Sequence, residues 1–103
     1  MANLLKEIIE DLEDQGYTAS DVDWVGTRNG NIATFAEFEK LAKDIDYYSG
    51  YGSQEINPEL IVVLKNGSWF ERAEYDGSEW FEFKEAPVKS TNARQLTKRN
   101  ILY

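Results

Sequence analysis

The stretch LIVVLKNGSWFERAEYDGSEWFEFK, residues 60–84, decides the fold of this 103-residue chain. It contains the dipeptides Asn66-Gly67 and Asp76-Gly77, both of which tolerate the positive φ of a type I′ hairpin turn. The sequence around these turns is apolar and aromatic, as is typical of strands. The stretch therefore predicts an antiparallel meander of three strands, at about 60–65, 68–75 and 78–84.

Two-residue loops at both turns would fix the register of this meander. Glu71 would then lie opposite Glu82 in the second hairpin, and Val63 opposite Phe70 in the first. Because side chains alternate along a strand, the register also predicts two sides of the sheet. The phenylalanine side would carry Ile61, Val63, Phe70, Phe81 and Phe83, with Arg72 among them. The tryptophan side would carry Leu60, Val62, Leu64, Trp69, Ala73 and Trp80, with Glu71 and Glu82 side by side.

Two amphipathic helices are predicted upstream of the meander. The first covers residues 3–15, with Asn3 as its N-cap and Gly16 as its stop. The second begins at Thr34, which has the capping-box spacing to Glu37. Their apolar stripes are Leu5, Ile8, Ile9 and Leu12 in the first helix, and Phe35, Phe38, Leu41, Ala42 and Ile45 in the second. We expect these stripes to cover the phenylalanine side, because that side holds fewer ionised groups.

A short strand is predicted between the helices, where Val22, Trp24 and Gly26 alternate with Asp23 and Val25. The stretch from Asp44 to Glu59 breaks all periodicity and is expected to form a surface loop. The predicted fold class is therefore α+β, with two helices packed on a three- to four-stranded antiparallel sheet, in the order α-β-α-β-β-β. We expect one domain over 1–88, followed by a basic tail over 89–103.

Charge is unevenly spread along the chain. Residues 1–88 hold all 19 acidic residues and 7 of the 11 basic ones, which leaves −12, and the tail carries Lys89, Arg94, Lys98 and Arg99. The body is therefore expected to repel nucleic acid and to attract basic surfaces. The first sixteen residues are too acidic for a secretory leader, and no apolar segment is long enough to span a membrane. Together with the lack of cysteine, these features predict a cytoplasmic protein with no membrane partner.

The residue inventory does not favour catalysis or metal binding. The chain has no histidine and no cysteine, which removes the commonest general base and the thiolate metal ligands. The acidic residues lack EF-hand spacing, and YSGYG at 48–52 lacks the context of a phosphate-binding loop. We therefore predict no enzyme, no cofactor, and no catalytic, cofactor-binding or metal-binding residues. The one catalytic alternative is the pair Glu71 and Glu82, since paired carboxylates act in glycoside hydrolysis.

The tripeptide Trp-Phe-Glu occurs twice, at 69–71 and at 80–82, on the two arms of one hairpin. Facing carboxylates repel each other, so a cation between them would stabilise the pair: Lys84, a tail arginine or a basic group of a partner. Trp and Tyr are also enriched at the energetic centres of interfaces. We therefore predict a partner-binding surface of Trp69, Glu71, Trp80 and Glu82, with Tyr48 and Tyr51 at its rim. The alternative is structural, since cross-strand aromatic pairs stabilise a meander and glutamates keep it soluble.

The segment FERAEYDGSEWFEF, with LIVVLKNGSW before it, resembles small uncharacterised proteins of Gram-positive bacteria and their phages, over residues 22–87. The resemblance implies an intracellular accessory protein of phage or prophage origin, and it carries over no catalytic or binding residue. The predicted function is a non-enzymatic protein that presents an acidic, aromatic sheet face to a basic protein partner or to a second copy of itself. The alternative is a single-strand nucleic-acid binder that uses Tyr47, Tyr48, Tyr51 and the basic tail.

Overall fold

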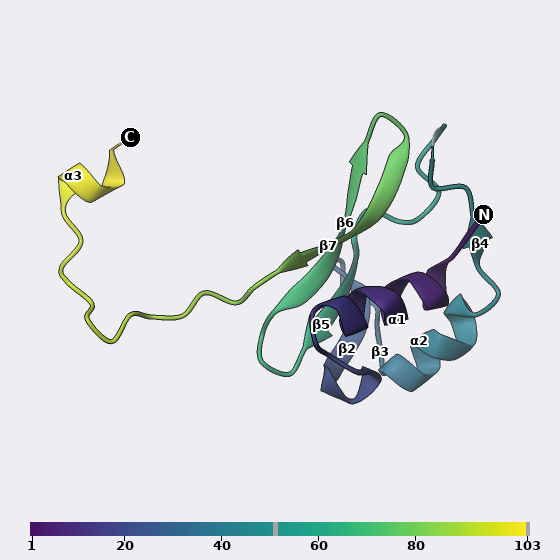
Figure 1. Ribbon diagram of the computed structural model, residues 1–103, viewed down its shortest axis with the longest axis horizontal. Coiled ribbons are helices and arrows are strands. Elements are labelled where there is room, and N and C mark those ends of the chain that lie inside the picture. The colour runs from purple at the N-terminus through teal and green to yellow at the C-terminus, as the bar shows by residue number, and fades with distance from the viewer. Residues whose placement is uncertain (51, 103) are drawn as a thin grey trace.

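The computed structural model describes residues 1–50 and 52–102. Two helices lie on one side of a twisted sheet, and the C-terminal tail leaves the body at the end opposite the N-terminus (Figure 1). The elements are β1 (Ala2–Asn3), α1 (Leu4–Asp14), η1 (Ala19–Asp21), β2 (Val22–Thr27), β3 (Ile32–Ala33), α2 (Phe35–Ala42), β4 (Asp46–Tyr47), β5 (Leu60–Leu64), β6 (Trp69–Tyr75), β7 (Ser78–Lys84) and α3 (Lys98–Ile101).

The main sheet has five strands in the order β3-β2-β5-β6-β7, and every neighbouring pair is antiparallel. A second sheet pairs β1 with β4. The α+β class is confirmed, but the predicted element order and sheet size are wrong. The prediction missed β1, η1, β3, β4 and α3, because each is only two to four residues long and carries no periodic signal.

Both main helices begin at the predicted caps. The Asn3 side-chain oxygen accepts a hydrogen bond from the amide of Lys6 at 3.0 Å. Thr34 and Glu37 form the reciprocal capping box, with bonds of 2.9 and 3.1 Å. Helix α1 ends before Gly16, whose φ of +82° is the left-handed conformation that glycine tolerates at a helix stop.

The helices cover the phenylalanine side of the sheet, as predicted. Their buried side chains and those of the sheet form one core, made of Leu4, Ile8, Leu12, Phe35, Phe38, Ala42, Val22, Val25, Val62, Leu64, Phe70 and Phe81, with Tyr47 and Ile56. Two members of the predicted α2 stripe are outside it: Leu41 is 68% exposed and Ile45 is 38% exposed. That expectation is wrong because α2 ends at Ala42, so Ile45 is no longer part of the helix, and because Leu41 lines two surface hollows instead of packing on the sheet.

The two hairpins of the meander differ in register. At Asp76-Gly77 both residues have positive φ, and Tyr75 pairs with Ser78, so the two-residue turn and its register are confirmed. At Asn66-Gly67 the loop instead contains three residues, because Leu64 and Ser68 close it through a 2.8 Å backbone hydrogen bond. The extra residue shifts the pairing by one.

The one-residue shift exchanges sides for the whole of β5. Val62 now pairs with Phe70, and Val63 with Trp69. Val62 and Leu64 are therefore buried on the phenylalanine side, and Ile61 and Val63 lie on the tryptophan side, the reverse of the prediction.

Strand β2 contains a bulge that also changes sides. Val22 pairs with Leu64 and Trp24 with Val63, so Asp23 is an extra residue without a partner. Val22 and Val25 point into the core, whereas Trp24 lies on the opposite side of the sheet. The predicted regular alternation of Val22, Trp24 and Gly26 is therefore wrong.

The tail is exposed along its whole described length, residues 87–102. It ends in α3, and its hydrogen bonds are local, between residues 90 and 102. Within the described residues, no helix has the length and apolar character needed to cross a lipid bilayer.

Candidate functional site

All three tryptophans of the chain lie on the side of the sheet opposite the helices. Trp24 on β2 is aligned through Val63 with Trp69 on β6, and Trp80 on β7 lies opposite Ala73 on β6. Directly opposed residues share a face of the sheet. We call this surface the tryptophan face; it consists of Trp24, Ile61, Val63, Trp69, Glu71, Ala73, Trp80 and Glu82.

Glu71 and Glu82 lie opposite each other on this face, as predicted. Glu71 accepts a 2.8 Å hydrogen bond from the indole nitrogen of Trp69 and lies 3.5 Å from the guanidinium of Arg28. Glu82 lies 3.7 Å from the ammonium of Lys84. Each carboxylate therefore has its own cation, and the expected single cation between them is replaced by two. Sequence reasoning missed Arg28, because the turn that brings it beside β6 is distant in sequence.

The open end of the tryptophan face lies on β7. Trp80 is 40% exposed, and the side chain of Glu82 is 48% exposed. Trp24 and Trp69 are only half-buried, and Ile61 on the same face is buried between the positions of Gly26 and Glu71. An indole and a carboxylate that are both accessible form an amphipathic surface of the kind found at interface centres.

The loop tyrosines have different environments. Tyr47 is buried, with 2% exposure, so it packs into the core and cannot stack on a base. Tyr48 is 46% exposed, and its amide donates to Glu55. The loop lies against the end of β7, since the carbonyl of Ser49 accepts from the amide of Glu79. Tyr51 lies outside the described residues, and its place at the rim stays a prediction.

A buried ionic cluster lies beneath the tryptophan face, on the helix side of the sheet. Arg72 donates to Glu79 at 3.0 Å, to the hydroxyl of Tyr47 at 3.0 Å and to Glu7 at 3.3 Å. The side chains of Arg72 and Glu79 are fully buried. The Arg72 guanidinium also lies over the ring of Phe81, 4.5 Å from its centroid. Because side chains alternate along a strand, Glu79 lies on the same side as Phe81, and Phe81 is on the same side as Arg72. The pair of Arg72 and Glu79 could therefore have been predicted from the sequence.

The cluster shifts the pKa of its members. Burial opposes the charge of Arg72, but hydrogen bonding to Tyr47 and the charge of Glu7 outweigh it and raise its pKa above the ordinary value. Burial, followed by the hydrogen bond to Glu7, raises the pKa of Tyr47 to about 12. Arg72 therefore stays charged and Tyr47 neutral across the physiological range.

Glu79 also fixes the surface loop. Its two carboxylate oxygens accept from the amides of Glu55 at 2.7 Å and Ile56 at 3.1 Å. Next to it, the hydroxyl of Ser78 donates to the carbonyl of Gly50 at 2.8 Å. The start of β7 therefore holds the loop through Ser78 and Glu79, and Trp80 follows directly on the tryptophan face.

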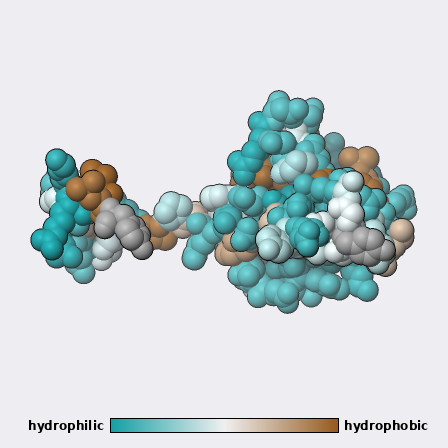
Figure 2. All heavy atoms as spheres, turned by 90° about the horizontal axis from the view of Figure 1, so that it is seen from above, coloured by the Kyte–Doolittle hydropathy of each residue, from teal (hydrophilic) through white to brown (hydrophobic). Residues whose placement is uncertain are grey.

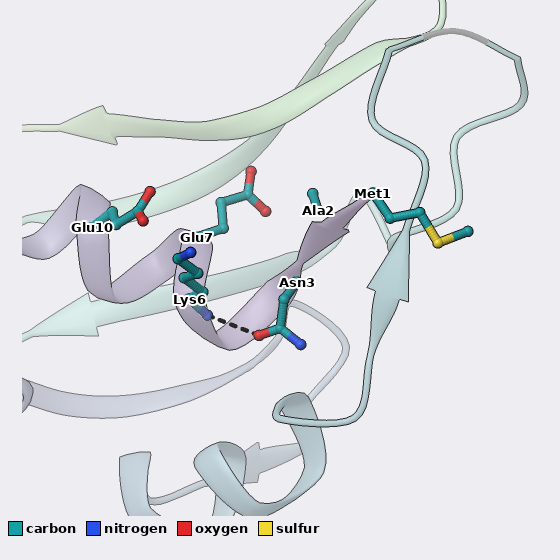
Figure 3. A pocket seen from close by; sticks show the side chains of 6 residues that line it. All are labelled: Met1, Ala2, Asn3, Lys6, Glu7 and Glu10. Carbon is teal, nitrogen blue, oxygen red and sulfur yellow. Dashed lines mark hydrogen bonds between the residues drawn. The ribbon is translucent and has the colours of Figure 1, made fainter.

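A hollow lies at the start of α1, with a volume of about 260 Å³ (Figure 3). Glu7 and Glu10 line it beside Lys6, and Glu7 points from the helix toward the meander, where it meets Arg72. Further along the same helix, burial and then the charge of Glu7 raise the pKa of Asp11 to about 6. Glu7 contributes to structure, because its carboxylate pairs with Arg72 in the ionic cluster.

Among the described residues, the acidic side chains form neither a metal-binding group nor part of a hollow at Glu71 and Glu82. Within residues 1–50 and 52–102, no group of three or more acidic side chains is placed to hold a metal ion. Glu71 and Glu82 do not line the hollow at α1 or either of the two hollows beside α2. Both carboxylates form ion pairs, Glu71 with Arg28 and Glu82 with Lys84.

Comparison with known proteins returned no match to a family model, to a curated protein or to a solved structure.

Proposed function

We propose that this chain is a binding protein without catalytic activity, whose tryptophan face docks on a basic protein. The observation that carries the proposal is the gathering of all three tryptophans on the sheet side opposite the helices. Indoles scattered for packing alone would be expected to enter the core, yet the core holds none of them. The accessory role in a phage or prophage that the hairpin resemblance implies stays a prediction.

Charge supports a basic partner over a neutral one. The body over 1–88 carries −12, and Glu82 is the most exposed charged group of the face. A basic side chain from a partner can displace Lys84, since that pair is 3.7 Å apart and exposed, and such pairs are worth about 0–1 kcal/mol. Trp80 beside it offers an aromatic surface over which an arginine can stack.

Affinity capture with matched variants tests this function. The wild-type chain, Trp80→Ala, Glu82→Lys and Glu10→Lys are immobilised, and proteins retained from a cell lysate are compared. Glu10→Lys makes the same charge change as Glu82→Lys on the exposed side of α1, away from the face. We expect basic proteins to be retained by the wild type and by Glu10→Lys, and to be lost from the two face variants.

Salt completes the test. Retention through a charged face should fall steeply between about 0.05 and 0.5 M NaCl, because the screening length shrinks. Equal loss of the retained proteins from Glu10→Lys would mean that net charge alone holds them, and retention unchanged by both face variants would refute the tryptophan face as the docking surface.

A further inference from the structure

An apolar groove runs along the uncovered flank of α2, on a different surface from the tryptophan face. Two hollows of about 350 and 220 Å³ share Phe38, Leu41 and Leu60 in their linings, so they form one continuous depression. We call it the α2 groove; Phe38, Leu41, Ile45, Ile56 and Leu60 form most of it, and Ile32 stands at one end. Leu41 is 68% exposed, which is unusual for a member of an apolar helix stripe, and Ile32 on β3 is 72% exposed.

The surroundings of the α2 groove are acidic. Residues 37–59 contain six acidic and two basic residues, a net charge of −4. Glu55 lines the larger hollow itself, and Asp44 and Glu59 are exposed next to the lining residues Ile45 and Leu60. The groove is therefore suited to a segment that combines apolar side chains with positive charge.

The C-terminal tail has this composition. Leu96, Ile101 and Leu102 are 63%, 69% and 64% exposed, and Arg94, Lys98 and Arg99 are exposed among them. Figure 2 shows hydrophobic residues uncovered beside hydrophilic ones at the far end of the tail. Helix α3 has only four residues, too few to be stable in water without a surface to pack on.

The tail points away from the groove of its own chain. It leaves the body from the end of β7, whereas the larger hollow is lined by Leu4 and Ile45, beside β1 and β4 at the opposite end (Figure 1). We propose that the α2 groove binds the C-terminal tail of a second copy of this chain. Reciprocal exchange of two tails closes a two-fold dimer, the commonest symmetry of protein assemblies.

The contacts of the proposed dimer follow from the chemistry of both parts. In the groove, the tail places Leu96, Ile101 and Leu102 against Leu41 and Ile45. The apolar surface of both parts is thereby removed from water. The basic residues Arg94, Lys98 and Arg99 lie along the acidic rim near Asp44, Glu55 and Glu59. The apolar contacts hold the tail in place, and the charges favour this segment over others and make binding sensitive to salt.

Light scattering on the full-length chain tests the proposal. At low salt and about 100 µM protein, we expect a mass about twice the chain mass of 11.9 kDa. Leu41→Glu in the groove and the pair Lys98→Glu with Arg99→Glu in the tail should each raise the dimer dissociation constant at least about tenfold. The control is Tyr75→Glu, which places the same charge on a 77% exposed aromatic residue at the distant hairpin tip and should leave the mass unchanged.

A charge swap separates contact from general repulsion. Mixing the tail variant Lys98→Glu, Arg99→Glu with the rim variant Glu55→Lys, Glu59→Lys should restore a heterodimer that neither variant forms alone at the same concentration. Leu41 and the rim residues are exposed or partly exposed, and circular dichroism checks that each variant is folded.

Four results would overturn the proposal. The first is a wild-type chain that stays monomeric at low salt, and the second is a dimer that survives the Leu41→Glu and tail variants. The third is a dimer that is lost in Trp80→Ala and not in Leu41→Glu. The fourth is a monomer whose hydrodynamic radius grows in Leu41→Glu, because its own tail had occupied the groove. Binding of an oligothymidine of about 20 nucleotides that requires Lys98 and Arg99, in a monomeric chain, would likewise assign the tail to nucleic acid. Loss of the dimer leaves the tryptophan-face proposal standing, since that proposal is tested by capture of other proteins.

Discussion

Replacing Arg72 with methionine should lower the free energy of unfolding far more than the loss of an exposed ion pair would. The substitution keeps an unbranched side chain against Phe81 and removes the guanidinium from between Glu79 and Glu7. Glu79, fully buried, then has no cation. Breaking a buried pair by removing one partner costs about 3–5 kcal/mol. Glu79 keeps two amide donors and Glu7 can reach water, so we expect the lower end of that range.

Urea unfolding followed by tryptophan fluorescence measures this loss. With a slope of about 1–3 kcal/mol per molar for a small domain, a cost of about 3 kcal/mol lowers the midpoint by at least about 1 M. Arg28→Met is the matched control, because it removes the same group from an exposed pair with Glu71 and should cost less than about 1 kcal/mol.

A double-mutant cycle checks the electrostatic cause. Adding Glu79→Gln to Arg72→Met removes the uncompensated charge while keeping an acceptor for the loop amides, so the double variant should lose at least about 1 kcal/mol less than the sum of the single variants. A loss in Arg72→Met as small as in Arg28→Met, or strict additivity in the cycle, would refute the view that the cluster is a coupled unit.

Three further predictions concern separate parts of the chain. The pKa of Asp11 is about 6 in the folded chain against an ordinary 3.8, so the folded state binds more protons and stability falls as pH rises from about 4 to about 6. Asp11→Asn should therefore raise the urea midpoint at about pH 7.5 and leave it unchanged at about pH 3.5; an equal gain at both values contradicts this origin. Gly26→Ala should lower the free energy of unfolding in urea by about 1–3 kcal/mol or more, because the added Cβ would lie 2.1 Å from the carbonyl oxygen of Asn31. In the control Gly50→Ala, the added Cβ meets only a side chain, at 3.4 Å. Similar urea midpoints for the two variants would show that the β2–β3 turn shifts at little cost. Trp80→Phe should remove most of the fluorescence that acrylamide quenches readily, since Trp80 is the most open indole; an undiminished quenchable fraction would place the accessible indole elsewhere.

The local parts of the fold were predictable because their signals lie within a few residues. Asn3 and the pair Thr34 and Glu37 mark helix starts through bonds to amides at most three residues away. The turn at Asp76-Gly77 sets its own register, which brought Glu71 opposite Glu82 as expected. Each of these depends on short-range geometry that the sequence states directly.

Single extra residues caused the errors in the sheet. Lys65, which joins Asn66 and Gly67 in the loop, and the unpaired Asp23 each shift a register by one, and neither has a distinctive sequence pattern. The candidate site changed as a result, since Trp24 joined Trp69 and Trp80 on one face. Leu41 shows a different limit, because periodicity identifies an apolar stripe without saying whether another element covers it.

The ionic cluster around Arg72 joins parts of the chain that the surface loop separates in sequence. Glu7 and Tyr47 come before Ser53 in the middle of the loop, Arg72 and Glu79 come after it, and β2 pairs with β5 across the same division. A backbone cut between Ser53 and Gln54 would therefore leave two pieces that still share a core, a strand pairing and a buried charge network. Such pieces, produced separately, are suited to fragment complementation, in which neither half folds alone and mixing them restores the native fluorescence.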